Sequence, residues 1–116
     1  MVNTQSKAES RAVRHKRLRS KVVGTTVRPR LAVFRSNRFV YAQIINDETG
    51  TTLAAVDSRT QKSGTALERA VIVGTEIAAK AKAAGVTSVV FDRGGFRYQG
   101  IIAALADGAR QGGLTF

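Results

Sequence analysis

Two stretches of this 116-residue chain combine arginines with aromatic rings, which suits them to bind anionic molecules that carry flat rings. The first is residues 28–46, RPRLAVFRSNRFVYAQIIN, and the second is residues 92–100, DRGGFRYQG. Guanidinium groups pair with phosphates in a bidentate way, and aromatic side chains stack on exposed bases. Both stretches therefore indicate binding of phosphates and bases rather than bond-breaking chemistry.

The chain shows no arrangement of side chains that is typical of catalysis. Its single histidine, His15, lies among arginines, and the carboxylates of Asp47, Glu48 and Asp57 fall in expected turns without forming a pair. Acid–base and nucleophilic sites need groups held rigidly at hydrogen-bond distance. There is no cysteine, which excludes disulfides and thiolate-held metals. We expect no catalytic residue, no metal and no cofactor.

The glycines of residues 92–100 leave an alternative open. Glycines between a strand and a helix can cradle a phosphate at the helix N-terminus. Gly94, Gly95 and Gly100 do not match G-x-G-x-x-G, however, and no Lys-Ser or Lys-Thr pair follows them. A small phosphate- or nucleotide-binding enzyme built on this loop is the alternative function, and saturable mononucleotide binding would favour it. An ordinary strand-to-helix turn with solvated arginines is the structural alternative.

The arginine-rich stretch at residues 28–46 is predicted to form a β-hairpin. Two apolar runs, 31–34 and 39–45, flank the polar break 35–38. A two-residue loop of Ser36 and Asn37 would place Val33 opposite Val40, and this register sorts the side chains onto two faces. One face is aliphatic and the other mixes cations, rings and an amide. The aliphatic face holds Leu31, Val33, Val40, Ala42 and Ile44, and the other holds Arg30, Phe34, Phe39, Tyr41 and Gln43. Scattered surface aromatics are also common without any function.

The rest of the chain supplies the elements that hold the hairpin. A third strand is expected at 51–56, with Leu53 opposite Ile44 and Ala55 opposite Ala42. A helix should begin at a capping box of Thr65 and Glu68 and end at Gly85. A buried strand at 86–91, a helix at 101–110 and a short tail at 114–116 that tucks back complete the order. The expected fold class is α/β (mixed α+β), a basic N-terminal arm followed by βββαβα, with one mostly antiparallel sheet and helices packed on one face.

The positive charge is concentrated near the N-terminus. The chain has 19 Lys and Arg against 8 Asp and Glu, a net charge of +11, and residues 1–30 hold nine cations and one acid. Such an arm on a nearly balanced domain indicates a polyanionic partner, most simply nucleic acid. An anionic membrane is the rival partner, but the arm lacks the apolar face that membrane-surface helices need. No apolar run approaches the ~20 residues of a membrane span, and we expect a cytoplasmic protein.

The division expected from this charge pattern is an arm and a domain. Residues 1–27 should form a basic, largely flexible RNA-binding arm, because their apolar residues are too sparse to offset chain entropy. Residues 28–116 should form a single α/β RNA-binding domain, with Gly24, Thr25 and Thr26 as the hinge between the two. The arm cations, the hairpin face and the loop at 92–100 together indicate RNA as the partner.

Several motifs resemble one family of proteins. RHKRLR at 14–19, RPRLAVFRSNRFVYAQIIND at 28–47, FDRGGFRYQG at 91–100 and ALADGARQGGL at 104–114 are similar to bacterial large-subunit ribosomal protein L18. The resemblance covers the chain from about residue 11 to Phe116. It departs from the family where Ile101, Ile102 and Ala103 follow Gly100 and at the Gln111-Gly112 ending, so it gives the final helix no RNA-binding role.

The resemblance implies a structural protein of the central protuberance, located on the cytoplasmic ribosome. Its implied partners are 5S rRNA, 23S rRNA and neighbouring ribosomal proteins, including the other 5S rRNA-binding proteins, with no membrane and no small-molecule substrate. The residues that we expect to contact RNA are Arg11, Arg14, His15, Lys16, Arg17, Arg19, Lys21, Arg28, Arg30, Phe34, Arg35, Ser36, Asn37, Arg38, Phe39, Tyr41, Gln43, Arg93, Phe96, Arg97 and Tyr98.

Overall fold

The structure is a computed structural model that describes residues 23–36, 38–59 and 64–116. Its elements follow the predicted order βββαβα. They are β1 (Arg30–Arg35), β2 (Val40–Asn46), β3 (Thr51–Asp57), α2 (Ala66–Ala83), β4 (Val90–Asp92) and α3 (Ile101–Gln111). The strands form one sheet in the order β3-β2-β1-β4. Among these described strands, β1 and β4 pair in parallel and the other two pairs are antiparallel, which confirms a mostly antiparallel sheet.

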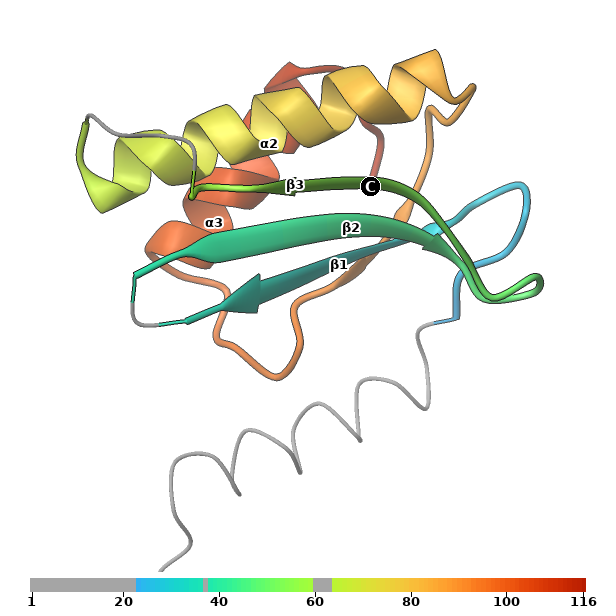
Figure 1. The fold of residues 1–116 in the computed structure, drawn as a ribbon, viewed down its shortest axis with the longest axis horizontal. Coiled ribbons are helices and arrows are strands. Elements are labelled where there is room, and N and C mark those ends of the chain that lie inside the picture. Colours follow the sequence, from blue (N-terminus) through green and yellow to red (C-terminus); the bar gives the residue numbers. More distant parts are fainter. Residues whose placement is uncertain (1–22, 37, 60–63) are drawn as a thin grey trace, which may run out of the picture.

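Both α2 and α3 lie on one face of the sheet, and neither covers the other face (Figure 1). The core forms between them and the sheet, and it includes the whole predicted aliphatic face of the hairpin, each residue exposed by 4% or less. These residues are Leu31, Val33, Val40, Ala42 and Ile44. The sequence pattern therefore identified the buried face of the hairpin correctly. We call the face away from α2 and α3 the open face.

The predicted hairpin register is wrong by two residues. Val33 pairs with Ala42 and Phe34 pairs with Tyr41, so Ser36 belongs to the closing pair of the ladder instead of the loop. The Ser36 N–H donates to the Phe39 carbonyl at 2.8 Å, and the Phe39 N–H donates to the Ser36 hydroxyl at 3.2 Å. The serine thus helps to close the hairpin that it was expected to turn. Because side chains alternate with period two, a shift of two preserves both faces.

The faces predicted for β3 are wrong. Thr52 pairs with Ile45, as the predicted pairing of Leu53 with Ile44 requires, but the register shifts between Ile45 and Ile44, so Ala54 lies opposite Ile44 instead. This β-bulge accommodates Leu53 as an extra residue, and it moves every later residue of β3 to the other face. Val56 is buried as a result, while Leu53 and Ala55 are exposed.

The two helices pack through a close glycine contact. The predicted capping box of Thr65 and Glu68 starts α2, and Gly85 follows its end with φ of +81°. Gly74 of α2 is buried, and a Cβ added there would strike the Leu105 carbonyl oxygen and lie 2.7 Å from the Ala109 nitrogen of α3. The helix backbones therefore approach more closely than any larger residue would allow.

The fourth strand is shorter than predicted. It covers Val90–Asp92, because the residues before it pair with the C-terminal tail and not with β1. The Thr115 N–H donates to the Thr87 carbonyl at 2.9 Å, and the Val89 N–H donates to the Thr115 carbonyl at 3.1 Å. Leu114 is buried beside them, which confirms that the tail tucks back onto the domain.

Candidate nucleic-acid interface

The open face of the sheet carries a group of three rings, which we call the Phe34 cluster. Phe34 of β1 is 51% exposed and lies between two other rings. Its centroid is 6.0 Å from that of Tyr41 on β2 and 5.7 Å from that of Phe96, which meets it edge-on. The hairpin and the loop at 92–100 thus form one surface, although some 60 residues separate Phe34 from Phe96.

Two glycines bring the loop at 92–100 against β1. Gly94 and Gly95 have φ of +62° and +79°, a conformation that glycine adopts without steric cost. A Cβ on Gly94 would lie 3.0 Å from the carbonyl oxygen of Val33, so the loop backbone touches the strand directly. The loop extends past β1 on the side of the sheet away from α2 (Figure 1). Phe96 of this loop is the residue that meets Phe34.

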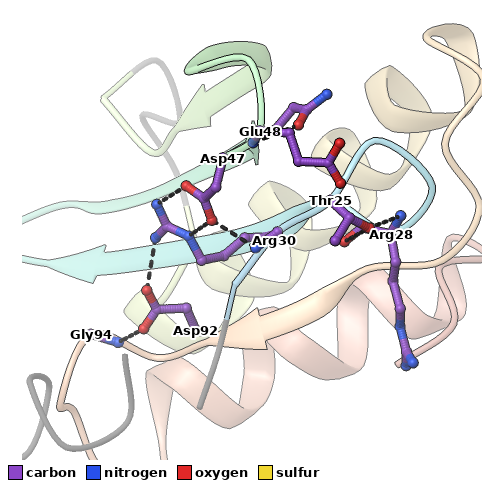
Figure 2. Close-up of polar contacts among 9 residues, drawn as sticks. Thr25, Arg28, Arg30, Asp47, Glu48, Asp92 and Gly94 are labelled. Carbon is purple, nitrogen blue, oxygen red and sulfur yellow. Dashed lines mark hydrogen bonds and ion pairs between the residues drawn. The ribbon is translucent and has the colours of Figure 1, made fainter. Parts of the chain in front are cut away.

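Arg30 is held inside the domain by two carboxylates, as Figure 2 shows. Its Nε and Nη2 donate to both oxygens of Asp47 at 3.0 and 3.1 Å, and its Nη1 donates to Asp92 at 2.8 Å. The side chain of Asp92 is 1% exposed and that of Arg30 is 12% exposed. Asp92 also accepts a hydrogen bond from the Gly94 N–H at 2.9 Å, which ties the glycine loop to this ion pair.

This ion pair changes the role expected for Arg30. The hydrogen bonds that Arg30 donates to Asp47 raise the pKa of Arg30 above its ordinary value, and the one that it donates to Asp92 adds to this, while burial acts in the opposite direction. Three of its five N–H groups are engaged by carboxylates, and the guanidinium is mostly covered. Arg30 therefore joins β1, the turn after β2 and the end of β4, and it offers RNA little access. Its sequence pattern alone did not distinguish this structural role from phosphate binding.

The remaining candidates near the sheet differ in exposure. Gln43 lies exposed on the open face, opposite Ala32. Arg97 is exposed and Arg93 is half-buried. Arg28 is exposed, although its Nε donates to the Val89 carbonyl at 3.2 Å. All four remain available to a partner that approaches the open face or its edges.

Tyr98 lies in a separate group of side chains. Its ring meets Phe91 edge-on at 6.0 Å, and Phe91 stacks on Phe116 at 5.3 Å. Arg110 of α3 donates to the Tyr98 hydroxyl at 2.8 Å and lies 4.4 Å from the Phe116 ring centroid. The structure thus joins Tyr98 to the C-terminal tail and not to the Phe34 cluster. No local sequence pattern links these four residues.

The hairpin turn faces a cleft on the helix side of the sheet. The cleft has a volume of about 370 Å³ and lies where the turn and the first turns of both helices meet. Its lining comprises Arg35, Ser36, Arg38, Phe39, Val40, Ser58, Ala66, Arg69 and Ile101. Phe39, predicted on the same face as Phe34, is among the residues that line this cleft. Arg69 and Ile101 were not among the predicted contacts, since only the fold brings their helices to the hairpin.

The arm candidates lie outside the residues that the structure describes. They are Arg11, Arg14, His15, Lys16, Arg17, Arg19 and Lys21, and Asn37 of the hairpin turn shares this status. The expected hinge is described, and it is attached to the domain. The Gly24 N–H donates to Asp47 at 2.7 Å, and Thr26 donates to Glu48 through its N–H and its hydroxyl.

The fold and these surfaces define a small basic α/β protein whose rings and arginines gather on binding surfaces. Across residues 23–36, 38–59 and 64–116, no group of three or more histidines, cysteines or acids is placed to hold a metal. Within the same ranges, no helix has the length and apolar character needed to cross a membrane.

Comparison with known proteins identifies the family. Residues 5–116 match the family model described as "Ribosomal L18 of archaea, bacteria, mitoch. and chloroplast". Relatives named large ribosomal subunit protein uL18 align over 100% of both chains. They come from Acholeplasma laidlawii at 51% identity, Lactococcus lactis subsp. cremoris at 53% and Lactobacillus delbrueckii subsp. bulgaricus at 50%. The chain belongs to the ribosomal L18 family. It is a structural protein of the ribosome, not an enzyme.

Proposed function

We propose that this chain binds 5S rRNA in the large ribosomal subunit and helps to attach it to 23S rRNA in the central protuberance, beside the other 5S rRNA-binding proteins. The Phe34 cluster carries this proposal. It places three rings from two distant segments on the sheet face that neither α2 nor α3 covers. RNA that is bound sequence-specifically presents unstacked bases, and aromatic side chains are the usual platform for them.

Charge supports the same partner. The chain carries a net charge of +11, the loop that reaches Phe34 holds Arg93 and Arg97, and the exposed Arg28 lies two residues before β1. Such cations bind the phosphates of an RNA backbone, whereas aromatic rings bind its bases. The relatives are named as proteins of the large ribosomal subunit, and the polyanion of that subunit is rRNA.

In this proposal, residues 1–27 are a basic arm that increases the affinity for rRNA. Residues 28–116 are the domain whose surface recognises the shape of the RNA. The cations of residues 1–22 outnumber the single acid by seven to one. Each of them that neutralises a phosphate contributes a salt-dependent term to binding. The arm therefore accounts for much of the salt dependence, and the domain for the choice of RNA.

The test is the affinity of Phe34 variants for 5S rRNA. Stacking is worth roughly 1–3 kcal/mol per base, so Phe34→Leu should weaken binding about five-fold or more. Phe34→Tyr keeps an aromatic ring at the same place and should bind nearly as the parent does. Fluorescence anisotropy with labelled 5S rRNA measures both, and circular dichroism checks that each variant is folded.

Two results would contradict the proposal. A folded parent chain with no preference for 5S rRNA over an unrelated RNA of equal length would remove the assigned partner. If Phe34→Leu and Phe34→Tyr bind equally well, the Phe34 cluster is a set of surface rings and not a binding platform.

A further inference from the structure

We propose that the cleft at the hairpin turn is a second RNA site, which takes one unpaired nucleotide of rRNA with its phosphate on arginines and its base against Phe39. This inference rests on the proposed rRNA-binding function and adds a binding site on the opposite side of the sheet. The Phe34 cluster lies on the open face, whereas the cleft is lined by Val40 of the buried face and by both helices.

Three elements converge to build the cleft. The turn between β1 and β2 supplies Phe39, the beginning of α2 supplies Ala66 and Arg69, and the beginning of α3 supplies Ile101. These elements meet at one end of the sheet, as Figure 1 shows. Ser58 is buried at the base of the cleft and is held to Val40 by two hydrogen bonds. The Ser58 N–H donates to the Val40 carbonyl and the Val40 N–H donates to the Ser58 hydroxyl, both at 3.0 Å. The cleft is therefore a feature of the packed fold.

The charge of the cleft is one-sided. Arg35, Arg38 and Arg69 line it, and the described residues of its lining include no acid. None of the three guanidinium groups forms a side-chain hydrogen bond or an ion pair with another described residue. Arg30 and Arg59 contrast with them, because each is paired with one or more carboxylates. Three cations of this kind around one recess have the arrangement expected of an anion site.

The size and the apolar walls favour a nucleotide. A volume of about 370 Å³ lies within the range of small-ligand pockets, roughly 300–1,000 Å³. Phe39 and Ile101 provide an apolar surface, and Phe39 can stack on any base. An acidic peptide would use the arginines but would leave the ring without a flat partner. The combination of guanidinium groups with an aromatic ring therefore favours RNA over an acidic protein segment.

The absence of cysteine in the sequence allows a direct test by site-specific crosslinking. Ala66 and Ala83 are the first and last residues of α2, both are exposed, and only Ala66 lines the cleft. Each is changed to cysteine, labelled with a photoactivated benzophenone and assembled into large ribosomal subunits. Gln43→Cys on the open face serves as the probe of the Phe34 cluster surface. Sequencing of the crosslinked RNA then identifies whether 5S or 23S rRNA is joined.

The proposal expects rRNA crosslinks from Ala66→Cys and Gln43→Cys, and little from Ala83→Cys. Adding Arg69→Gln to the Ala66→Cys chain should lower its RNA product several-fold, because a charge-assisted hydrogen bond to phosphate is removed. Lys82→Gln makes the same charge change at the other end of α2 and should have no such effect. Phe39→Leu should also lower the product, since it removes the stacking ring.

The outcomes separate this inference from the proposed function. Crosslinks from Gln43→Cys to rRNA with none from Ala66→Cys would overturn the second site and leave the first intact. A crosslink from Ala66→Cys to protein alone would assign the cleft to a protein neighbour and also overturn the inference. No RNA crosslink from Gln43→Cys would count against the Phe34 cluster as an RNA surface.

Discussion

Arg30→Ala should destabilise the domain strongly. The variant leaves the Asp92 carboxylate, whose side chain is 1% exposed, without the cation that now lies 2.8 Å away. Removing one partner of a buried ion pair costs roughly 3–5 kcal/mol. The lower end applies here, because the Asp47 side chain is 19% exposed and Asp92 keeps its hydrogen bond from Gly94. We expect a loss of about 3 kcal/mol, a large part of the 5–15 kcal/mol typical of a whole domain.

Urea unfolding followed by circular dichroism measures this loss. With a slope of about 1–3 kcal/mol/M, the midpoint should fall by roughly 1–3 M. Arg97→Ala is the matched control, since Arg97 is exposed and makes no side-chain hydrogen bond or ion pair with another described residue. Its unfolding free energy should change by no more than about 0.5 kcal/mol. Arg30→Lys keeps the charge but loses the bidentate fork, so its midpoint should lie between those of Arg30→Ala and the parent.

The opposite pattern would refute a structural role for Arg30. If Arg30→Ala unfolds at the same urea concentration as Arg97→Ala but binds 5S rRNA much more weakly, Arg30 contacts RNA and the two carboxylates contribute little. If Arg30→Ala does not fold, the position of the Arg30→Lys midpoint still decides the question, because an unchanged midpoint would show that the fork geometry is unimportant.

Two further predictions concern packing and the arm. Gly74→Ala should lower the thermal midpoint despite the ~1 kcal/mol gain in helix propensity, because its Cβ meets the α3 backbone. A raised midpoint would contradict the close helix contact. Deleting residues 1–22 should leave the thermal midpoint unchanged and flatten the slope of log K against log[salt] by roughly 0.7–0.9 for each phosphate that the arm neutralises. Deleting residues 1–24 should also lower the midpoint, because Gly24 is buried and donates to Asp47; equal midpoints for both truncations would contradict that attachment.

The faces of the hairpin could be predicted from sequence, but its pairing could not. Alternation of apolar and polar residues determines which side chains are buried, and a register shift of two leaves that assignment intact. Whether Ser36 turns the chain or closes the ladder depends on which backbone groups its hydroxyl meets, and the structure shows that it meets Phe39. The consequence was local, since the shift changed the partners within the hairpin and left its buried face as predicted.

The pairing of β3 could not be predicted from sequence, because of its β-bulge. The turn at residues 47–50 predicts the pairing of Thr51 and Thr52 correctly, and nothing in TTLAAV marks Leu53 as an extra residue. Leu53 is the largest apolar side chain of that strand, so burial would have favoured it for the core. The smaller residues Ala54 and Val56 take the core positions under α2 instead, which fits the close approach of this helix to β3.

The role of each arginine depended on which carboxylates the fold brings near it. Asp47 and Asp92 lie 17 and 62 residues from Arg30 in sequence, yet both contact it. Asp57 pairs with Arg59 at 2.9 Å, and that hydrogen bond lowers the pKa of Asp57. Sequence position alone ranked Arg30 with the RNA-binding arginines, because pairings over such distances leave no local pattern.

The placement of the acids also indicates how RNA approaches the domain. Asp47 and Glu48 follow β2, at the end of the strand opposite to the hairpin turn, and they engage Arg30 and Thr26 there. Arg35, Arg38 and Arg69 have no carboxylate partner among the described residues and lie at the other end, in the hairpin turn and the first turn of α2, while Arg97 lies in the loop at 92–100. A polyanion is repelled by the acidic turn and attracted by these cations. We therefore expect rRNA to enclose the hairpin-turn end of the domain, with the Phe34 cluster on one side of the sheet and the cleft on the other.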